Sequence, residues 1–382
     1  MNRSRRLMLR QLALAAAAAA AAPAVLQACR RGGEGSGEGS GEGSELVIST
    51  FPLYIDADAP GTPGSVVRFR RDTGINLRYL EDVNDVRQFF ARIRPDLARG
   101  RSPGQDLVVL TSWMAQRLIS LGWLDPLPLE QVPNRRHLIP DLQKAPWDPD
   151  GRYTLPWQSG IAGIAYNIKA TGRELLGIDD LFDPALRGRV SALTEMRDTM
   201  GLLMLADGQS IDHPTWSQAQ NAFRRLELAR RDGQIRRFTG NDYQNDLLAG
   251  NLAACIGWSG DVAQLALEQP DLRFVVPASG GVLWADVMMM PRGSGHRREA
   301  ARWLNWVYDP REAARIAAAV QYISPVQGVQ QILAADPGTA KLAASPLMFP
   351  SQADQHRLHV FGPLDPEEEA RWEERFAAIT EA

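Results

Sequence analysis

The chain has 382 residues, with 42 Lys and Arg, 45 Asp and Glu, and a formal net charge of −3. This balance argues against a nucleic-acid partner, which would require a basic face, and it is compatible with a cationic ligand. The chain is also long enough to form two lobes with separate hydrophobic cores rather than a single core.

The first 28 residues have the layout of an export signal. Four Arg residues precede an Ala-rich apolar run that is interrupted by Pro23, as in the charged and apolar regions of a signal peptide. The segment 4–10 resembles a twin-arginine signal. An N-terminal transmembrane anchor is the weaker alternative, because the run is dominated by Ala and is followed at once by two Arg residues.

Cys29 ends a Leu-Gln-Ala-Cys sequence that resembles a bacterial lipobox, in which the Cys is acylated and becomes the mature N-terminus. A Gly-Glu-Gly-Ser sequence then repeats three times over 33–44, a composition that cannot build a core and is typical of a flexible linker. We therefore expect a signal peptide at 1–28, a linker at 29–44, and a membrane tether through a lipid on Cys29.

Short apolar runs alternate with helical patterns along the rest of the chain, which predicts an α/β fold. A helix is expected over 65–73, closed by Gly74, and another after the third strand, with Met114, Leu118 and Leu121 on one face. Strands are expected at 46–50, 75–80, 106–110, 161–166, 253–257 and 272–276.

Several aromatic and sulfur-containing side chains are better interpreted as parts of the hydrophobic core than as parts of a functional site. The last helix should begin at Asp365 and bury Trp372 and Phe376, which are spaced four residues apart. Trp303 shares a helical face with apolar neighbours. Cys255 lies in an apolar run and has no partner left for a disulfide, so we expect a buried, unreactive thiol.

Two segments place an indole near an acid directly after a predicted strand. They are Trp258 with Asp261, and Trp284 with Asp286. In an extended chain Trp284 and Asp286 point to the same face, so both side chains could contact the same group of a ligand. An amine suits this pair, because a cation gains energy over an indole face and donates a charge-assisted hydrogen bond to a carboxylate. A core indole beside a turn-forming acid is an equally good interpretation of either pair alone.

Glu195 and Asp198 form a third acidic candidate, after an apolar strand-like run. Helix N-capping with a local ion pair explains them equally well. Glu81, Asp82 and Asp85 form a further acidic cluster, for which solvated loop acids are the better explanation.

The mature chain resembles the extracytoplasmic spermidine/putrescine-binding proteins of ABC importers over nearly its whole length. The most specific element is Gly-Gly-x-x-Trp-x-Asp at 280–286. The other segments that carry the resemblance are 49–54, 69–75, 106–109, 153–157, 163–167, 258–261 and 322–325.

The resemblance implies a two-lobed periplasmic-binding-protein fold of type II, in which each lobe is a mostly parallel sheet flanked by helices. It implies that lobe 1 comprises 45–163 and 284–324, and lobe 2 comprises 164–283 and 325–382. It also implies capture of a polyamine between the lobes and delivery to an ABC permease, by a monomer that is not an enzyme and uses no cofactor or metal. The ligand-binding residues carried over from the family are Phe51, Tyr54, Thr111, Trp113, Glu195, Asp198, Trp258, Asp261, Trp284, Asp286 and Tyr322.

Phe51 and Pro52 depart from the family pattern, since neither side chain can donate a hydrogen bond. Two rival functions remain open. A hydrolase would use Ser259, but the residue two after it is Asp261 rather than the Gly of the nucleophile elbow. A binder of the same fold could instead take thiamine, a quaternary amine or an anion.

Overall fold

Two groups of parallel strands lie at the two ends of one mixed sheet in this computed structural model, which describes residues 45–142 and 145–382. The order is β2-β1-β3-β10-β5-β8-β6-β7. The first group is β1 (Glu45–Ser49), β2 (Asn76–Leu80) and β3 (Leu107–Thr111). The second is β6 (Val190–Leu193), β7 (Ile235–Thr239) and β8 (Ala254–Trp258).

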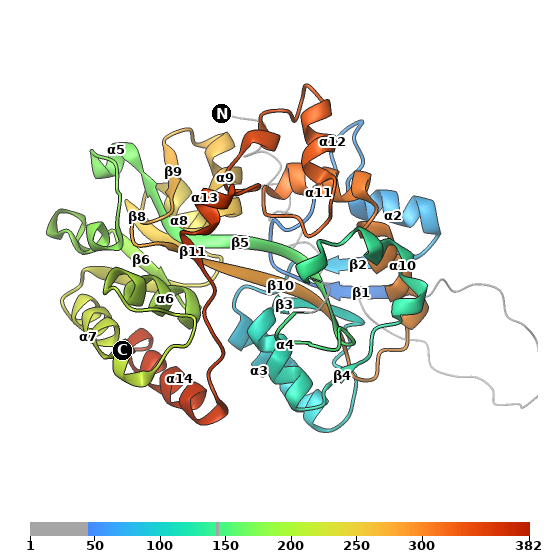
Figure 1. The fold of residues 1–382 in the computed structure, drawn as a ribbon, viewed down its shortest axis with the longest axis horizontal. Coiled ribbons are helices and arrows are strands. Elements are labelled where there is room, and N and C mark those ends of the chain that lie inside the picture. Colours follow the sequence, from blue (N-terminus) through green and yellow to red (C-terminus); the bar gives the residue numbers. More distant parts are fainter. Residues whose placement is uncertain (1–44, 143–144) are drawn as a thin grey trace, which may run out of the picture. The chain divides into compact units, whose positions relative to one another are not determined.

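Two long strands join these groups, and they pair with each other antiparallel. They are β5 (Thr154–Asn167) and β10 (Gly281–Pro291), which lie side by side across the middle of Figure 1. β10 pairs with β3, and β5 pairs with β8, both antiparallel. Short strands complete the sheet, namely β4 (Leu124–Asp125), β9 (Leu272–Val275) and β11 (Leu358–His359). The mixed α/β fold with a largely parallel sheet is thereby confirmed.

Helices cover both groups of strands. Those beside the first group are α2 (Ser65–Thr73), α3 (Val86–Ala98), α4 (Ser112–Ser120), α10 (Arg297–Val307), α11 (Pro310–Val320) and α12 (Val329–Ala335). Those beside the second are α5 (Ile168–Thr171), α6 (Met196–Ala206), α7 (Trp216–Arg231), α8 (Tyr243–Ala249), α9 (Ser259–Glu268) and α14 (Pro366–Thr380), with α14 lying against α7. A single turn, α13 (Gln352–Gln355), precedes β11.

The buried apolar side chains form two separate clusters, which we call the first core and the second core. Leu46, Leu107 and Trp303 belong to the first core, whereas Leu193 and Trp372 belong to the second. Two hydrophobic centres in one chain confirm the expected two-lobed organisation.

The core changes within each long strand. Trp157 of β5 packs in the first core and Ala162 in the second. Val282 of β10 packs in the second core and Val287 in the first. The two strands therefore cross between the cores at neighbouring positions of the sheet.

The segment after residue 325 differs from the expected assignment to lobe 2. Val326, Val329, Leu333, Ala343 and Met348 pack in the first core, whereas Phe361, Leu364 and the final helix, with Trp372, Phe376 and Ile379, pack in the second. The apolar stripe of α12 docks on α11 before the chain crosses, and local periodicity cannot reveal which core a stripe will meet.

Most local predictions are confirmed. α2 ends at Gly74 with a φ of 73°, the left-handed conformation that Gly adopts without steric cost. Asp365 caps α14 by accepting hydrogen bonds from the first-turn N–H groups of Glu367 and Glu368. Cys255 is a buried free thiol. Leu121 was wrongly placed on the buried face of α4: it is 46% exposed, because the helix ends at Ser120 and the chain turns away at Gly122.

Candidate functional site

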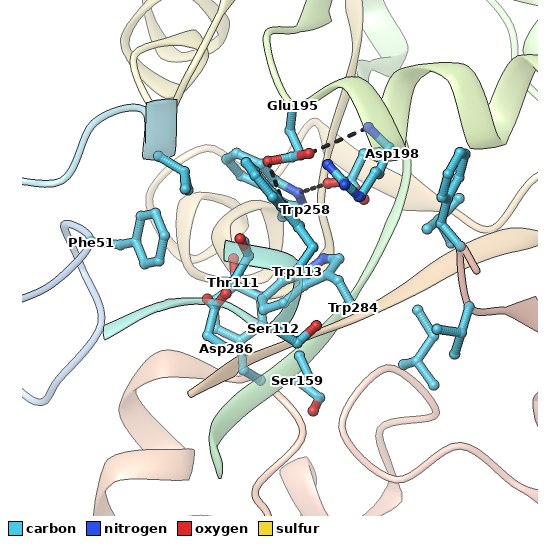
Figure 2. A pocket seen from close by; sticks show the side chains of 18 of the residues that line it. Phe51, Thr111, Ser112, Trp113, Ser159, Glu195, Asp198, Trp258, Trp284 and Asp286 are labelled. Carbon is cyan, nitrogen blue, oxygen red and sulfur yellow. Dashed lines mark hydrogen bonds between the residues drawn. The ribbon is translucent and has the colours of Figure 1, made fainter. Parts of the chain in front are cut away.

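A cavity of about 240 Å³ lies where β3, β10, α6 and β8 meet, and both cores contribute to its walls. All eleven residues named as ligand-binding candidates from the sequence line it. They are Phe51, Tyr54, Thr111, Trp113, Glu195, Asp198, Trp258, Asp261, Trp284, Asp286 and Tyr322. Figure 2 shows that Asp286 lies on one side of the cavity and Glu195 and Asp198 on the other, with indole rings between them.

Asp286 is held on β10 as a buried carboxylate, with 4% of its surface exposed. Antiparallel pairing with β3 sets it opposite Thr111. The Tyr54 hydroxyl donates a hydrogen bond of 2.7 Å to its Oδ2, whereas its Oδ1 has no hydrogen-bond partner within the described residues. Burial raises the pKa of Asp286 to about 7; the charges of Glu195 and Asp261 add to this, and the bond from Tyr54 opposes it. A cation beside this group would stabilise its charged form.

Glu195 and Asp198 occupy the opposite side, at the start of α6. Glu195 is the N-cap, and its Oε1 accepts a hydrogen bond of 3.3 Å from the N–H of Arg197. One helical turn brings Asp198 to the same wall. Burial raises the pKa of Asp198 well above its usual value, and the charge of Glu195 adds to that rise. Burial also raises the pKa of Glu195, opposed by the nearby Arg197 charge.

Two indole N–H groups hold these acids in place. Trp258 Nε1 donates to Asp198 Oδ2 over 2.7 Å, and Trp113 Nε1 donates to Glu195 Oε2 over 3.3 Å. The bonds fix the indole planes as cavity walls and orient the two carboxylates. Glu195 therefore caps α6, as one interpretation of this segment expected, and it also lines the cavity together with Asp198.

Asp261 accepts three hydrogen bonds from protein side chains, which occupy both of its carboxylate oxygens. Tyr322 donates to Oδ1 over 2.6 Å, while Tyr243 and Gln244 donate to Oδ2 over 2.8 and 2.7 Å. The three bonds lower the pKa of Asp261, although burial still leaves it raised. Asp261 thus positions the Tyr322 ring rather than offering a free acceptor.

Aromatic rings complete the walls. The Tyr322 ring lies 5.3 Å from both Trp284 and Tyr54, in edge-to-face contacts. Phe51 packs edge-on against Tyr54 at 5.7 Å. Gly160 of β5 makes room for this cluster, since a Cβ there would lie 2.3 Å from Trp284 Cζ2 and 2.8 Å from Tyr322 Cδ1. Such a cluster presents flat apolar surfaces to the methylene chain of a ligand.

Several cavity residues were missed from the sequence. Arg197 lies between two candidates, but its role depends on contacts with distant segments. Asp85 was taken as a solvated loop acid, whereas it caps α3 and accepts a bond of 2.6 Å from the Thr194 hydroxyl. No short pattern marks these positions, because they come from segments far apart in the sequence that meet only in the folded chain. The missed lining residues include Asn84, Asp85, Ser112, Trp147, Ser159, Thr194, Arg197, Asn241 and Phe361.

Ser259 does not have the geometry of a hydrolase nucleophile. Its side chain is fully buried, and its Oγ accepts a hydrogen bond of 3.2 Å from the N–H of Ile161. A nucleophile elbow would instead expose this hydroxyl to substrate. Across 45–142 and 145–382, no group of three or more His, Cys, Asp or Glu side chains is arranged to hold a metal ion.

The signal peptide, Cys29 and the linker at 29–44 all fall outside the described residues. In the part of the chain that is described, no helix combines the length and apolarity needed to cross a bilayer.

Two cores joined by crossing strands, with a charged and aromatic cavity between them, define a binding protein of the two-lobed solute-capturing class. The chain matches the model of the bacterial extracellular solute-binding proteins over residues 65–350 and belongs to that family. The family description places the protein outside the cytoplasm.

Named relatives are similar over most of the chain. The putrescine-binding periplasmic protein PotF of Escherichia coli is 26% identical over 325 residues, covering 80% of this chain and 84% of PotF. A putrescine/agmatine-binding protein of Pseudomonas aeruginosa is 28% identical over 287 residues, covering 70% of this chain and 76% of that protein. The structure of the spermidine/putrescine substrate-binding protein PotD of Streptococcus pneumoniae superposes with a TM-score of 0.69 at 20% identity, covering 88% of this chain and 98% of PotD. All three are named as binding proteins.

Proposed function

We propose that this protein captures a polyamine between its two lobes and delivers it to an ABC permease. The observation that carries the proposal is the placement of Asp286 and the pair Glu195 and Asp198 on opposite sides of one cavity. Burial disfavours the charged form of each of these carboxylates. A ligand with an ammonium group at each end would stabilise the charged carboxylates on both sides of the cavity at once.

The aromatic walls favour the same ligand. Trp113, Trp258 and Trp284 lie between the acidic sides of the cavity. Their faces suit methylene groups by apolar contact and ammonium groups by cation–π attraction. A quaternary amine fits less well, because it has no N–H with which to satisfy the carboxylate oxygens.

Closure of the lobes is the proposed transport step. The eleven candidate residues come from both cores, so a bound ligand stabilises only the arrangement in which the two cores approach each other. A permease would recognise that closed state. Lobe 1 is proposed to comprise residues 45 to about 160 and residues 286–348, which include the end of β10. Lobe 2 is proposed to comprise the remaining described residues.

The chain before residue 45 is proposed to export and anchor the protein. A twin-arginine type signal at 1–28, acylation of Cys29 and the linker to residue 44 together would hold a monomeric binding protein near its permease. The protein is proposed to have no catalytic activity and no cofactor. Mass spectrometry of the mature protein from its native host tests the lipid on Cys29.

Isothermal titration of the purified protein with putrescine and spermidine tests the proposed ligand. We expect saturable binding with a 1:1 stoichiometry and an increase in Tm, with thiamine and choline as comparison ligands. Absence of heat and of thermal shift with both polyamines refutes the proposal. Tighter binding of thiamine or choline than of either polyamine would assign the site to a different amine class.

A further inference from the structure

Arg197 is a fixed cation in the wall of the cavity. It lies on α6 between Glu195 and Asp198, and its side chain is 10% exposed. Its guanidinium carbon stands 4.1 Å from the centre of the Trp113 ring, and it forms an ion pair with Glu369 of α14. Arg keeps its charge at any physiological pH, and these contacts leave it little freedom to move away.

The position of Arg197 changes the charge that the cavity can accept. Its positive charge partly offsets Glu195 and Asp198, since it opposes the rise in the pKa of both. It also occupies one face of the Trp113 indole, which is therefore closed to a ligand cation. Asp286, on the other side, has no such cation facing it among the residues that line the cavity within the described ranges.

We propose that Arg197 determines ligand charge, so that the site accepts a diamine and rejects a longer amine that carries a third positive charge. This inference rests on the polyamine-binding function proposed above. One ammonium group meets Asp286 and the second meets Glu195 and Asp198. A third ammonium group near the guanidinium of Arg197 would meet a like charge at a largely buried position, where solvent screens the repulsion weakly.

Binding of putrescine and spermidine is measured with the wild type, Arg197→Gln and Arg197→Lys. We expect the wild type to prefer putrescine by about tenfold or more, as one repulsive contact of about 1.4 kcal/mol implies. The Gln variant should lose most or all of the preference for putrescine. The Lys variant, which retains the charge, should keep that preference. The ratio of two affinities in one preparation does not depend on the fraction of active protein.

Arg117→Gln is the matched control. Arg117 belongs to the same ionic network, 3.0 Å from both Glu369 and Glu373 and 5.5 Å from the Trp113 ring, but it does not line the cavity. We expect this variant to keep the wild-type preference. An equal change in both Gln variants would attribute selectivity to the network between the cores and overturn the direct role of Arg197.

A second measurement needs no variant. N1-acetylspermidine is at least as long as spermidine but carries two positive charges instead of three. The wild type should therefore bind it more tightly than spermidine. Equal affinities would show that length, not charge, is discriminated, and would overturn the inference. A wild type that prefers spermidine, or an unchanged ratio in Arg197→Gln, also overturns it while leaving polyamine binding intact. Failure of the wild type to bind either polyamine refutes the proposed function itself.

Discussion

Replacement of Asp286 by Asn should weaken polyamine binding by about 2 kcal/mol or more, or about thirtyfold. The variant keeps the shape of the side chain and an oxygen that can accept the bond from Tyr54, which is 2.7 Å in the wild type. It loses the negative charge that would face the ligand ammonium. Because the residue is 4% exposed, water cannot easily replace that interaction.

The dependence of affinity on pH gives this prediction a distinctive signature. The pKa of Asp286 is about 7 in the protein without ligand, and a bound cation lowers it. The carboxylate is about one-tenth ionised near pH 6 and about nine-tenths ionised near pH 8, so its contribution should raise wild-type affinity about tenfold across that interval. Binding near pH 6 should also release a proton to the buffer.

Isothermal titration of both proteins, in buffers that differ in ionisation enthalpy, measures the affinity and the proton release together. Glu195 and Asp198 also have raised pKa values and contribute to the wild-type slope, so the difference between the two proteins isolates Asp286. Arg197 and the Tyr54 hydroxyl are common to both. Unchanged affinity in the variant, or the same slope with pH in both proteins, would refute the assignment of Asp286 to the site.

Three further outcomes are expected. Without ligand, Asp286→Asn should raise Tm by an amount that grows from about pH 4 to pH 7 and then levels off, because Asp286 ionises near its usual pKa in the unfolded chain but stays protonated up to its pKa of about 7 in the folded protein; a difference that does not change between pH 4 and pH 7 would contradict this. Gly160→Ala should lower stability by about 1–3 kcal/mol and weaken binding, since its Cβ would displace the rings of Trp284 and Tyr322, and calorimetry with tryptophan fluorescence reports both effects. Asp365→Ala should cost about 1 kcal/mol in urea unfolding by removing the cap of α14 while leaving polyamine affinity unchanged, and an affinity loss would mean that the cap also supports the site.

Local structure was predictable where short-range chemistry decides it. The 65–73 helix and its Gly74 end, the Asp365 cap and the extended chain at 284–286 all depend on residues close in sequence. The indole and acid pairs also predicted residues that line one common cavity, because strand ends and the first turn of the following helix share one edge of a sheet.

Features that depend on distant contacts were not predictable. β5 extends well before the predicted start at residue 161, because its first half pairs with β10 in the first core. Asp261, like Asp286, closely follows a Trp in the sequence, yet Tyr243 and Gln244 of α8 donate hydrogen bonds to its carboxylate. The side chain of Arg197 is held in position by an ion pair with Glu369, which is 172 residues away in the sequence. Neither composition nor spacing records such partners.

The irregularity in the pairing of β5 and β10 has a mechanical consequence. Asp286 faces Gln158, but the next residue, Val287, faces Pro156, so Trp157 is an extra residue at that step of the ladder. Extra residues of this kind bend a ribbon and increase its local twist. The bend in the two crossing strands therefore coincides with the carboxylate proposed to receive the ligand, so that a change in that bend would also re-aim the carboxylate.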